Sequence, residues 1–304
     1  MSGPGVVRTI GAVLVVTSLV LPNAPRSPHA ADHLLLVGID GLGSEGLRHA
    51  RAPAIHALIN EGAHTLAARG VMPTVSSPNW ASMISGAGPE QHGVTSNDWE
   101  PNRHPIDPVA TDGANIFPTI FGVVRHQMPQ AAVGIVHEWD GFARLVEPGV
   151  ATIMRHEVNA DKTVATAAAF IRERSPMLTV VHLDLVDHAG HTAGWLTPDY
   201  VQAVEKADAL VATLLTAIDN AGMRAGTIVM ISADHGGVGK SHGGLTRAEI
   251  EIPWIISGPG VKRGHIIEAP VSTTDTAPTI LFVLGVPAPA VWVGRPVLDA
   301  FVTH

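Results

Sequence analysis

The sequence predicts an α/β fold: a three-layer α/β/α sandwich with a mostly parallel central sheet and a small cap insertion. Five short runs rich in Val, Ile and Leu alternate with segments of helical spacing. Such alternation produces a parallel sheet that helices cover on both faces. The 304 residues, 46% of them hydrophobic, are enough for one large domain with a full core.

The expected strands are apolar runs that end in Gly, Pro or polar residues. The first covers residues 33–39 (HLLLVGI) and ends at Asp40 and Gly41, which places a carboxylate at the tip of a buried strand. The other four expected strands cover residues 131–137, 178–184, 226–232 and 252–257.

Helical patterns lie between these runs. Residues 44–62 carry apolar side chains at helical spacing, and residues 77–87 have Pro78 in the first turn, where proline is favoured. Ser76 then stands at a helix N-terminus, where backbone N–H groups and the helix dipole favour an anion. Further helices are expected over residues 115–128, 160–175, 198–222 and 276–285.

Residues 98–118 differ from their neighbours because they are polar and rich in Pro. We interpret them as a surface excursion over the functional site, the core of a cap that we place within residues 98–160. Substrate specificity is expected to reside in this range.

The N-terminus resembles an export signal. Arg8 precedes an apolar run from Ile10 to Leu21, and small residues follow. We therefore predict a signal peptide over residues 1–31, cleaved near Ala30 and Ala31, and a secreted or periplasmic domain over residues 32–304. A retained anchor is the alternative, although the run is short for a membrane span. No later run reaches that length.

The composition limits the partners. The net charge is −8, and no run of Lys or Arg follows the N-terminal segment, so a nucleic-acid-binding surface is not expected. Free nucleotides remain possible substrates, because metal charge alone can hold one small anion. The chain has no cysteine, which excludes disulfides, thiolate chemistry and Cys as a metal ligand.

Carboxylates and imidazoles follow several of the expected strands. Asp187 and His191 lie four residues apart, so one turn of chain aims both at one cation. Asp234 and His235 are adjacent before two glycines, and a tight turn there aims them at a second cation. Taken singly, an Asp at a strand end often caps a helix, and a lone His is more often structural. The remaining candidates are Asp40 and His242.

Together these ligands and the hydroxyl of Ser76 predict a site for two divalent metal ions and phosphoryl transfer. His and Asp ligands do not separate zinc from manganese or iron.

The motifs resemble the alkaline phosphatase superfamily, and most closely its type I phosphodiesterase/nucleotide pyrophosphatase family, over roughly residues 33–290. In that family the nucleophile is a Thr or Ser three residues before an Asn in a Pro-flanked stretch, which matches Ser76, Pro78 and Asn79. A following element that ends in an Asn matches Gly86 to Asn97. The remaining matches are Asp187 to His191 and Asp234 to Gly236.

The resemblance implies two zinc ions about 4 Å apart and an alkaline-phosphatase-like fold. It implies that Ser76 contacts one zinc, attacks phosphorus and forms a phosphoserine that water hydrolyses, while Asn97 holds a phosphoryl oxygen. The implied ligands of one ion are Asp187, His191 and His242, and those of the other are Asp40, Asp234 and His235.

Several neighbouring residues have other interpretations. Thr74 and Ser77 are rival hydroxyls. His92 is interpreted as structural, His188 stays open, and Asp275 is interpreted as a helix N-cap. We expect His182 and Asp184 to be buried or to support the ligands, and the tryptophans at positions 80, 99 and 139 to serve the core or a substrate pocket.

Other functions stay open at this point. A phosphomonoesterase or a phosphonate hydrolase would use the same metals and nucleophile, and no Arg is singled out to select a monoester; Arg103, Arg125 and Arg144 are candidates. A sulfatase needs Arg at the position of Trp80. A non-catalytic metal-binding or phosphate-binding protein is a further alternative. The expected partner is a small phosphate ester, and the oligomeric state is open.

Overall fold

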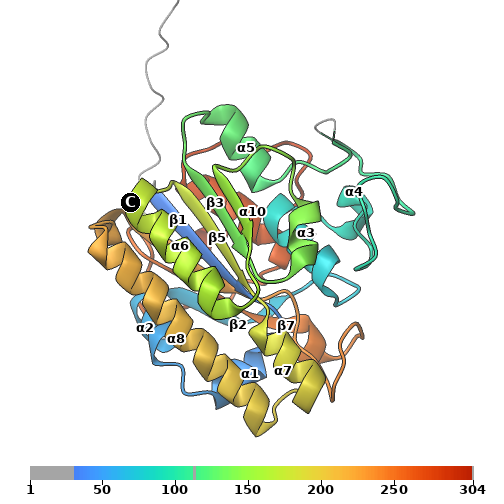
Figure 1. The fold of residues 1–304 in the computed structure, drawn as a ribbon, viewed down its shortest axis with the longest axis vertical. Coiled ribbons are helices and arrows are strands. Elements are labelled where there is room, and N and C mark those ends of the chain that lie inside the picture. Colours follow the sequence, from blue (N-terminus) through green and yellow to red (C-terminus); the bar gives the residue numbers. More distant parts are fainter. Residues whose placement is uncertain (1–30, 112–113, 303–304) are drawn as a thin grey trace, which may run out of the picture.

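The computed structural model describes residues 31–111 and 114–302, and it has three layers around one eight-stranded sheet (Figure 1). The signal peptide predicted over residues 1–31 lies, except for Ala31, outside the described residues. Among the helices described, none has the length and apolar character needed to span a bilayer. The predicted fold class is confirmed.

The strands run through the sheet in the order β4-β3-β5-β1-β6-β7-β2-β8. Strands β1, β3, β4, β5 and β6 are mutually parallel, and β7 is antiparallel to both of its neighbours. Their bounds are β1 (His33–Ile39), β2 (Ala63–Arg69), β3 (Val133–His137), β4 (Ile153–His156), β5 (Leu178–Leu183), β6 (Thr227–Ser232), β7 (Glu251–Ser257) and β8 (His265–Ile266).

Helices cover both faces of this sheet. In Figure 1, α6 and α8 lie over one face with α1 and α2, and α3, α5 and α10 lie on the other side. The bounds are α1 (Ser44–His49), α2 (Pro53–Glu61), α3 (Ser76–Ser85), α4 (Pro89–His92), α5 (Ile120–Gln127), α6 (Ala160–Arg174), α7 (Leu185–Ala193), α8 (Pro198–Asn220), α9 (Arg247–Ile250) and α10 (Thr276–Val283). The 3-10 turns include η1 (Asp140–Leu145) and η3 (Thr273–Asp275).

One predicted helix is wrong in its extent. Residues 44–62 form two helices, α1 and α2, separated by Ala50 to Ala52, because Pro53 begins the second helix and disfavours a helical conformation in the residue before it. The strands β2, β4 and β8 and the helix α7 were not predicted. Their sequences are mixed in polarity or only two residues long, so they carry no clear period.

The range 98–160 divides into two parts. Residues 101–119 contain no helix and no strand among those described, and this irregular segment lies beside α3 and α4 in Figure 1. Residues 120–156 supply α5, β3 and β4 to the main layers. The excursion is therefore shorter than the range 98–160.

Strand β1 is the centre of the core. It lies between β5 and β6, and Leu36 in its middle has no exposed surface. Replacing Leu36 with Ala should lower the free energy of unfolding by about 2–5 kcal/mol through lost burial and a residual cavity. Leu245 is 75% exposed, and its replacement with Ala should change this free energy by less than about 0.5 kcal/mol. Urea denaturation of both variants measures the difference, and equal losses would contradict the assignment of β1 to the core.

Candidate metal centre and nucleophile

Three carboxylates meet at one edge of the sheet. Asp40 follows β1 directly, Asp234 follows β6, and Asp187 lies in the first turn of α7 after β5. Because β1, β5 and β6 are parallel, their carboxyl ends lie at the same edge, where α/β sheets gather functional groups. The topology therefore explains how residues far apart in sequence come together.

Each of these carboxylates keeps one buried oxygen without a hydrogen-bond donor among the described residues: Oδ1 of Asp40, Oδ1 of Asp187 and Oδ2 of Asp234. The other oxygens each lie beside a polar atom. Oδ1 of Asp234 accepts the backbone N–H of Gly41 at 3.1 Å, and Oδ2 of Asp187 lies 3.3 Å from His191 Nε2. An unpaired buried oxygen is costly, so these three atoms call for a positive partner.

Three imidazoles turn Nε2 toward this site and Nδ1 toward the backbone. Nδ1 of His191, His235 and His242 lies 2.9–3.0 Å from the carbonyl oxygens of Lys240, Gly236 and Thr74, respectively. A carbonyl only accepts, so Nδ1 carries the proton and Nε2 of the neutral ring keeps a lone pair. Metal-binding histidines are commonly oriented in this way.

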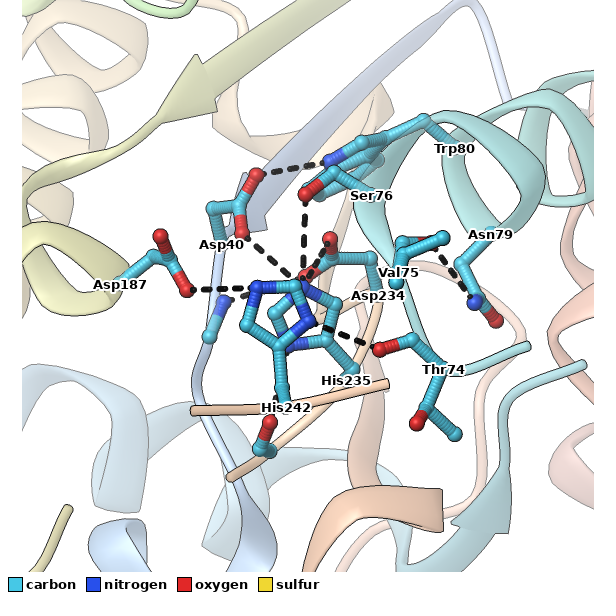
Figure 2. A network of polar contacts seen from close by, with 12 residues as sticks. Asp40, Thr74, Val75, Ser76, Asn79, Trp80, Asp187, Asp234, His235 and His242 are labelled. Atoms are coloured by element: carbon cyan, nitrogen blue, oxygen red, sulfur yellow. Dashed lines mark hydrogen bonds and ion pairs between the residues drawn. The ribbon is translucent and has the colours of Figure 1, made fainter. Parts of the chain in front are cut away.

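The ligand atoms form two close groups, which Figure 2 shows around His235. One contains Asp40, Asp234 and His235, and the other contains Asp187, His235 and His242; within each, the atoms lie within 4.8 Å of one another. The first group matches the trio expected from the sequence. In the second group His235 stands where His191 was expected, although the rings of His191 and His242 are only 5.0 Å apart.

Burial and mutual repulsion dominate the electrostatics of the carboxylates. Burial, with the nearby Asp40 charge, raises the pKa of Asp187 to about 9. Burial, with the nearby Asp187 charge, raises the pKa of Asp234 to about 8. The pKa of Asp40 is also raised well above its ordinary value by burial and by Asp234. Asp187 and Asp234 therefore keep their protons near pH 7 in the metal-free fold, and a bound divalent cation would favour their ionised forms.

The imidazoles shift in the opposite direction. Burial, with neighbouring His235, lowers the pKa of His242 to about 4, and burial also lowers the pKa of His235. These rings are therefore neutral near pH 7 and present lone pairs. Unpaired carboxylate oxygens together with neutral imidazoles are a donor set that fits divalent metal ions.

The hydroxyl of Ser76 faces this donor set. Ser76 is buried at the first position of α3, and its Oγ lies 3.4 Å from His235 Nε2 (Figure 2). Asn79 fixes the preceding loop, because its side chain accepts from Val71 N at 2.7 Å and donates to the carbonyls of Val71, Pro73 and Val75. The conformation that presents Ser76 is thus held by one buried amide.

The two rival hydroxyls have other partners. Thr74 donates to Gly244 O at 2.8 Å and accepts from Gly243 N at 3.1 Å, so it holds the loop that carries His242. Ser77 Oγ accepts from Arg144 Nη2 at 3.4 Å. Of the three hydroxyls, the one beside the metal-ligand candidates is Ser76.

Asn97 also reaches the start of α3. Its Oδ1 accepts the backbone N–H of Ser77 at 2.8 Å, which leaves its amide N–H groups without a partner among the described residues. Arg144 donates to the carbonyl of Asn97 and lies 3.5 Å from Glu100. Among the three candidate arginines, Arg144 is therefore the one beside Ser76, because Arg125 binds the 129–152 loops and Arg103 binds Asp98 O.

The remaining candidates fall outside the site. His92 is buried, bonds Ser82 Oγ at 2.9 Å and accepts from Val94 N, in agreement with a structural role. His188 is exposed on α7. Asp275 occupies the N-cap position of α10 as expected, but its side chain accepts from Ser272 N and from Arg295 N, not from α10.

Two contacts of Asp40 Oδ2 were not predicted from the sequence. Trp80 Nε1 lies 3.0 Å from this oxygen, and His182 Nε2 lies 3.1 Å from it. The alternation along β5 indicated burial of His182 but not its partner. Its register partner in β1 is Gly38, and a glycine there was the available signal, since a Cβ at Gly38 would lie 2.5 Å from the Trp80 ring.

The sequence is similar to those of several known proteins. Ectonucleotide pyrophosphatase/phosphodiesterase family member 1 of Rattus norvegicus is 24% identical over 234 residues, which are 70% of this chain and 25% of that protein. Arylsulfatase K of Danio rerio is 30% identical over 93 residues, 29% of this chain and 18% of that protein. The chain thus spans about a quarter or less of the length of these curated relatives.

Solved structures agree on the fold. An inactive form of murine ectonucleotide pyrophosphatase/phosphodiesterase 5, in complex with AMP, superposes with a TM-score of 0.73 at 15% identity, over 89% of this chain and all of that one. A 2-O GAG sulfatase superposes with a TM-score of 0.69 at 17% identity, over 88% of this chain and 73% of that one. The model of the family described as type I phosphodiesterase / nucleotide pyrophosphatase matches residues 34–242, more than half of the chain. The chain therefore belongs to the type I phosphodiesterase/nucleotide pyrophosphatase family, within the alkaline phosphatase superfamily.

Proposed function

We propose that this protein is a metal-dependent hydrolase of phosphodiester or pyrophosphate bonds that acts through a covalent phosphoserine. One observation carries the proposal: unpaired carboxylate oxygens and imidazole lone pairs converge beside the hydroxyl of Ser76. Family membership supports the same reaction class. The N-terminal sequence supports action outside the cytoplasm.

Two divalent cations fit the donor set, and the family resemblance points to zinc. Asp40, Asp234 and His235 would hold one, and Asp187 and His242 would hold the other with His191 beside them. When bound, such ions supply the positive charge that lowers the pKa of a nearby hydroxyl and stabilises the phosphoryl group during transfer.

Ser76 is the proposed nucleophile. Its oxygen forms a bond to phosphorus while the bond from phosphorus to the leaving oxygen breaks, and the hydroxyl proton passes to solvent or to the leaving group. The products are a released alcohol or phosphate and a phosphoserine that still carries the second ester group of a diester. A water molecule then attacks the phosphoserine and regenerates Ser76. The N-terminal end of the α3 dipole lies at Ser76 and favours the anionic phosphoryl group.

Asn97 is the proposed donor to a non-bridging phosphoryl oxygen. Its Oδ1 is held by Ser77 N, so the amide N–H groups are directed away from the helix end and are free for a ligand. A fixed donor of this kind stabilises charge in the transition state without reorganisation. Arg144, bound to the carbonyl of Asn97, keeps that residue in place.

A small nucleotide is the proposed substrate class. A relative of the same fold is described in complex with AMP, and curated relatives are described as nucleotide pyrophosphatases. Phosphomonoester hydrolysis is the second candidate, because the guanidinium of Arg144 lies beside Ser77 and would favour a doubly charged ester. A sulfatase is disfavoured, since Trp80 replaces the required Arg and is buried against Asp40.

The proposal predicts hydrolysis of bis-p-nitrophenyl phosphate that a chelator abolishes and added zinc restores. Replacing Ser76 with Ala should lower kcat by about 10³-fold or more, because the nucleophile is lost. A radioactive phosphodiester substrate quenched with acid should label the wild-type chain at Ser76, as located by mass spectrometry.

The control is Ser85→Ala, which removes another buried hydroxyl of α3 that bonds Ala81 O. This variant should keep the label. A label on Thr74 or Ser77 would refute the assigned nucleophile. Faster hydrolysis of p-nitrophenyl phosphate than of the bis-ester would favour the monoesterase.

Changing Asn97 to Asp tests the proposed donor. Asp keeps the acceptor for Ser77 N and removes the amide N–H groups, so the fold should persist while kcat/KM falls by about 10²-fold or more. Thermal unfolding should be close to that of the wild type. Asn102→Asp is the control on the exposed segment, and its kcat/KM should not change. Equal kcat/KM for the wild type and Asn97→Asp would remove Asn97 from the reaction.

The raised carboxylate pKa values predict how metal removal affects stability. In the metal-free fold the pKa of Asp234 is about 8 and that of Asp187 about 9, against 3.8 ordinarily, so the folded state binds more protons than the unfolded chain. The stability of metal-free protein therefore falls as pH rises toward 9. In zinc-loaded protein the metal charge compensates the ionised carboxylates. The difference in Tm between the two forms should therefore widen from about pH 6.5 to 9.

Differential scanning calorimetry of stripped and zinc-loaded protein measures this difference. The variant Asp187→Asn/Asp234→Asn cannot ionise at these positions, so the Tm of its metal-free form should depend less on pH, with Asp40 as the remaining carboxyl of raised pKa. A Tm difference that narrows toward pH 9 would contradict the proposed metal centre.

A further inference from the structure

The carboxylate of Asp40 is held unequally on its two sides. Oδ2 accepts from Trp80 Nε1 at 3.0 Å and from His182 Nε2 at 3.1 Å. Oδ1 has no hydrogen-bond donor in the part of the chain that the structure describes, and it lies 3.5 Å from His235 Nε2. Figure 2 shows Trp80 on one side of this carboxylate and His235 on the other. One oxygen is thus fully engaged and the other is left free.

The donors are of a kind that fixes orientation. An indole nitrogen can only donate. His182 is 1% exposed, its Nδ1 has no partner among the described residues, and Nε2 faces a carboxylate, so the proton of the neutral ring lies on Nε2. Two N–H groups on one oxygen prevent the carboxylate from rotating without breaking both bonds.

Both donors are themselves locked by packing. The rings of Trp80 and His182 lie edge to face with centroids 4.7 Å apart, and Phe142 lies 5.3 Å from His182. Opposite His182 in the sheet is Gly38, and the absence of a side chain there makes room for the Trp80 ring. The strand register and one glycine therefore place the two donors.

We propose that Trp80 and His182 are positioning residues that hold Asp40 so that Oδ1 is presented to the cation it would share with Asp234 and His235. This inference rests on the proposed metal-dependent function and adds what orients one ligand. Partners that fix a metal ligand in this way typically contribute about 10–100-fold to metal affinity.

One arrangement competes with this proposal. Ligand atoms of Asp40, His182 and Asp184 also lie within 4.8 Å of one another, as a third cation would require. The bond from His182 Nε2 to Asp40 argues against a metal at that nitrogen, because it carries a proton and has no lone pair. The count of bound ions separates the two arrangements.

The experiment measures zinc affinity rather than activity. The full chain is stripped of metal and titrated with Zn²⁺ in competition with a chromophoric chelator, and the wild type should bind two ions. Trp80→Phe and His182→Leu should each weaken one of the two sites by about 10–100-fold and leave the other unchanged. His182→Gln can still donate from its amide nitrogen, and it should retain more affinity than His182→Leu.

Matched controls separate positioning from general damage. Trp99→Phe removes a second buried indole, and His92→Leu removes a second buried imidazole, one that bonds Ser82; neither contacts a ligand candidate, and both should keep the two affinities. If His182→Leu does not fold, Trp80→Phe alone carries the test, since it keeps an aromatic ring in the core.

Three results would overturn the inference. Unchanged affinities in Trp80→Phe and His182→Leu would show that Asp40 needs no such support. A third zinc in the wild type that His182→Leu loses would make His182 a ligand. Fewer than two zinc ions in the wild type would remove the proposed function itself, a failure that is visible before any variant is measured.

Discussion

The carboxylates of Asp40, Asp187 and Asp234 lie together at the carboxyl ends of the central strands, each with one buried oxygen that no donor in the described chain satisfies. Burying carboxylates without a partner has a large free-energy cost. The tightly packed strands β1, β5 and β6 hold these groups in place. A pair of divalent cations is the partner that this arrangement fits.

The surrounding hydrogen bonds hold the metal-ligand candidates and Ser76 in position. The imidazoles of His191, His235 and His242 each donate a hydrogen bond from Nδ1 to a backbone carbonyl and so keep Nε2 free. On the other side of the site, Asn79 holds the loop before Ser76 and Asn97 caps the N–H of Ser77. The groups that would meet a phosphoryl group are thus fixed before any substrate arrives, which is how electrostatic stabilisation becomes effective.

Much of the fold and of the site could be predicted from the sequence, because strands and motifs are local signals. The five predicted strands and the ligands at their ends follow from apolar runs that stop at Asp or before a turn. What could not be predicted depends on long-range contacts. The contact of His182 with Asp40 depends on the register of β1 with β5, and the contact of Arg144 with Asn97 joins residues 47 positions apart. The replacement of His191 by His235 in one close group depends on how the 236–242 loop folds back.

The most direct measurement is anomalous diffraction from crystals grown with zinc and a phosphate analogue. A two-metal centre predicts two separate zinc peaks. One contacts Asp40 Oδ1, Asp234 and His235, and the other contacts Asp187 Oδ1 and His242, with the analogue against Ser76 Oγ. No peak in this cluster, or a single peak with Ser76 turned away from it, would contradict a two-metal centre beside the Ser76 nucleophile.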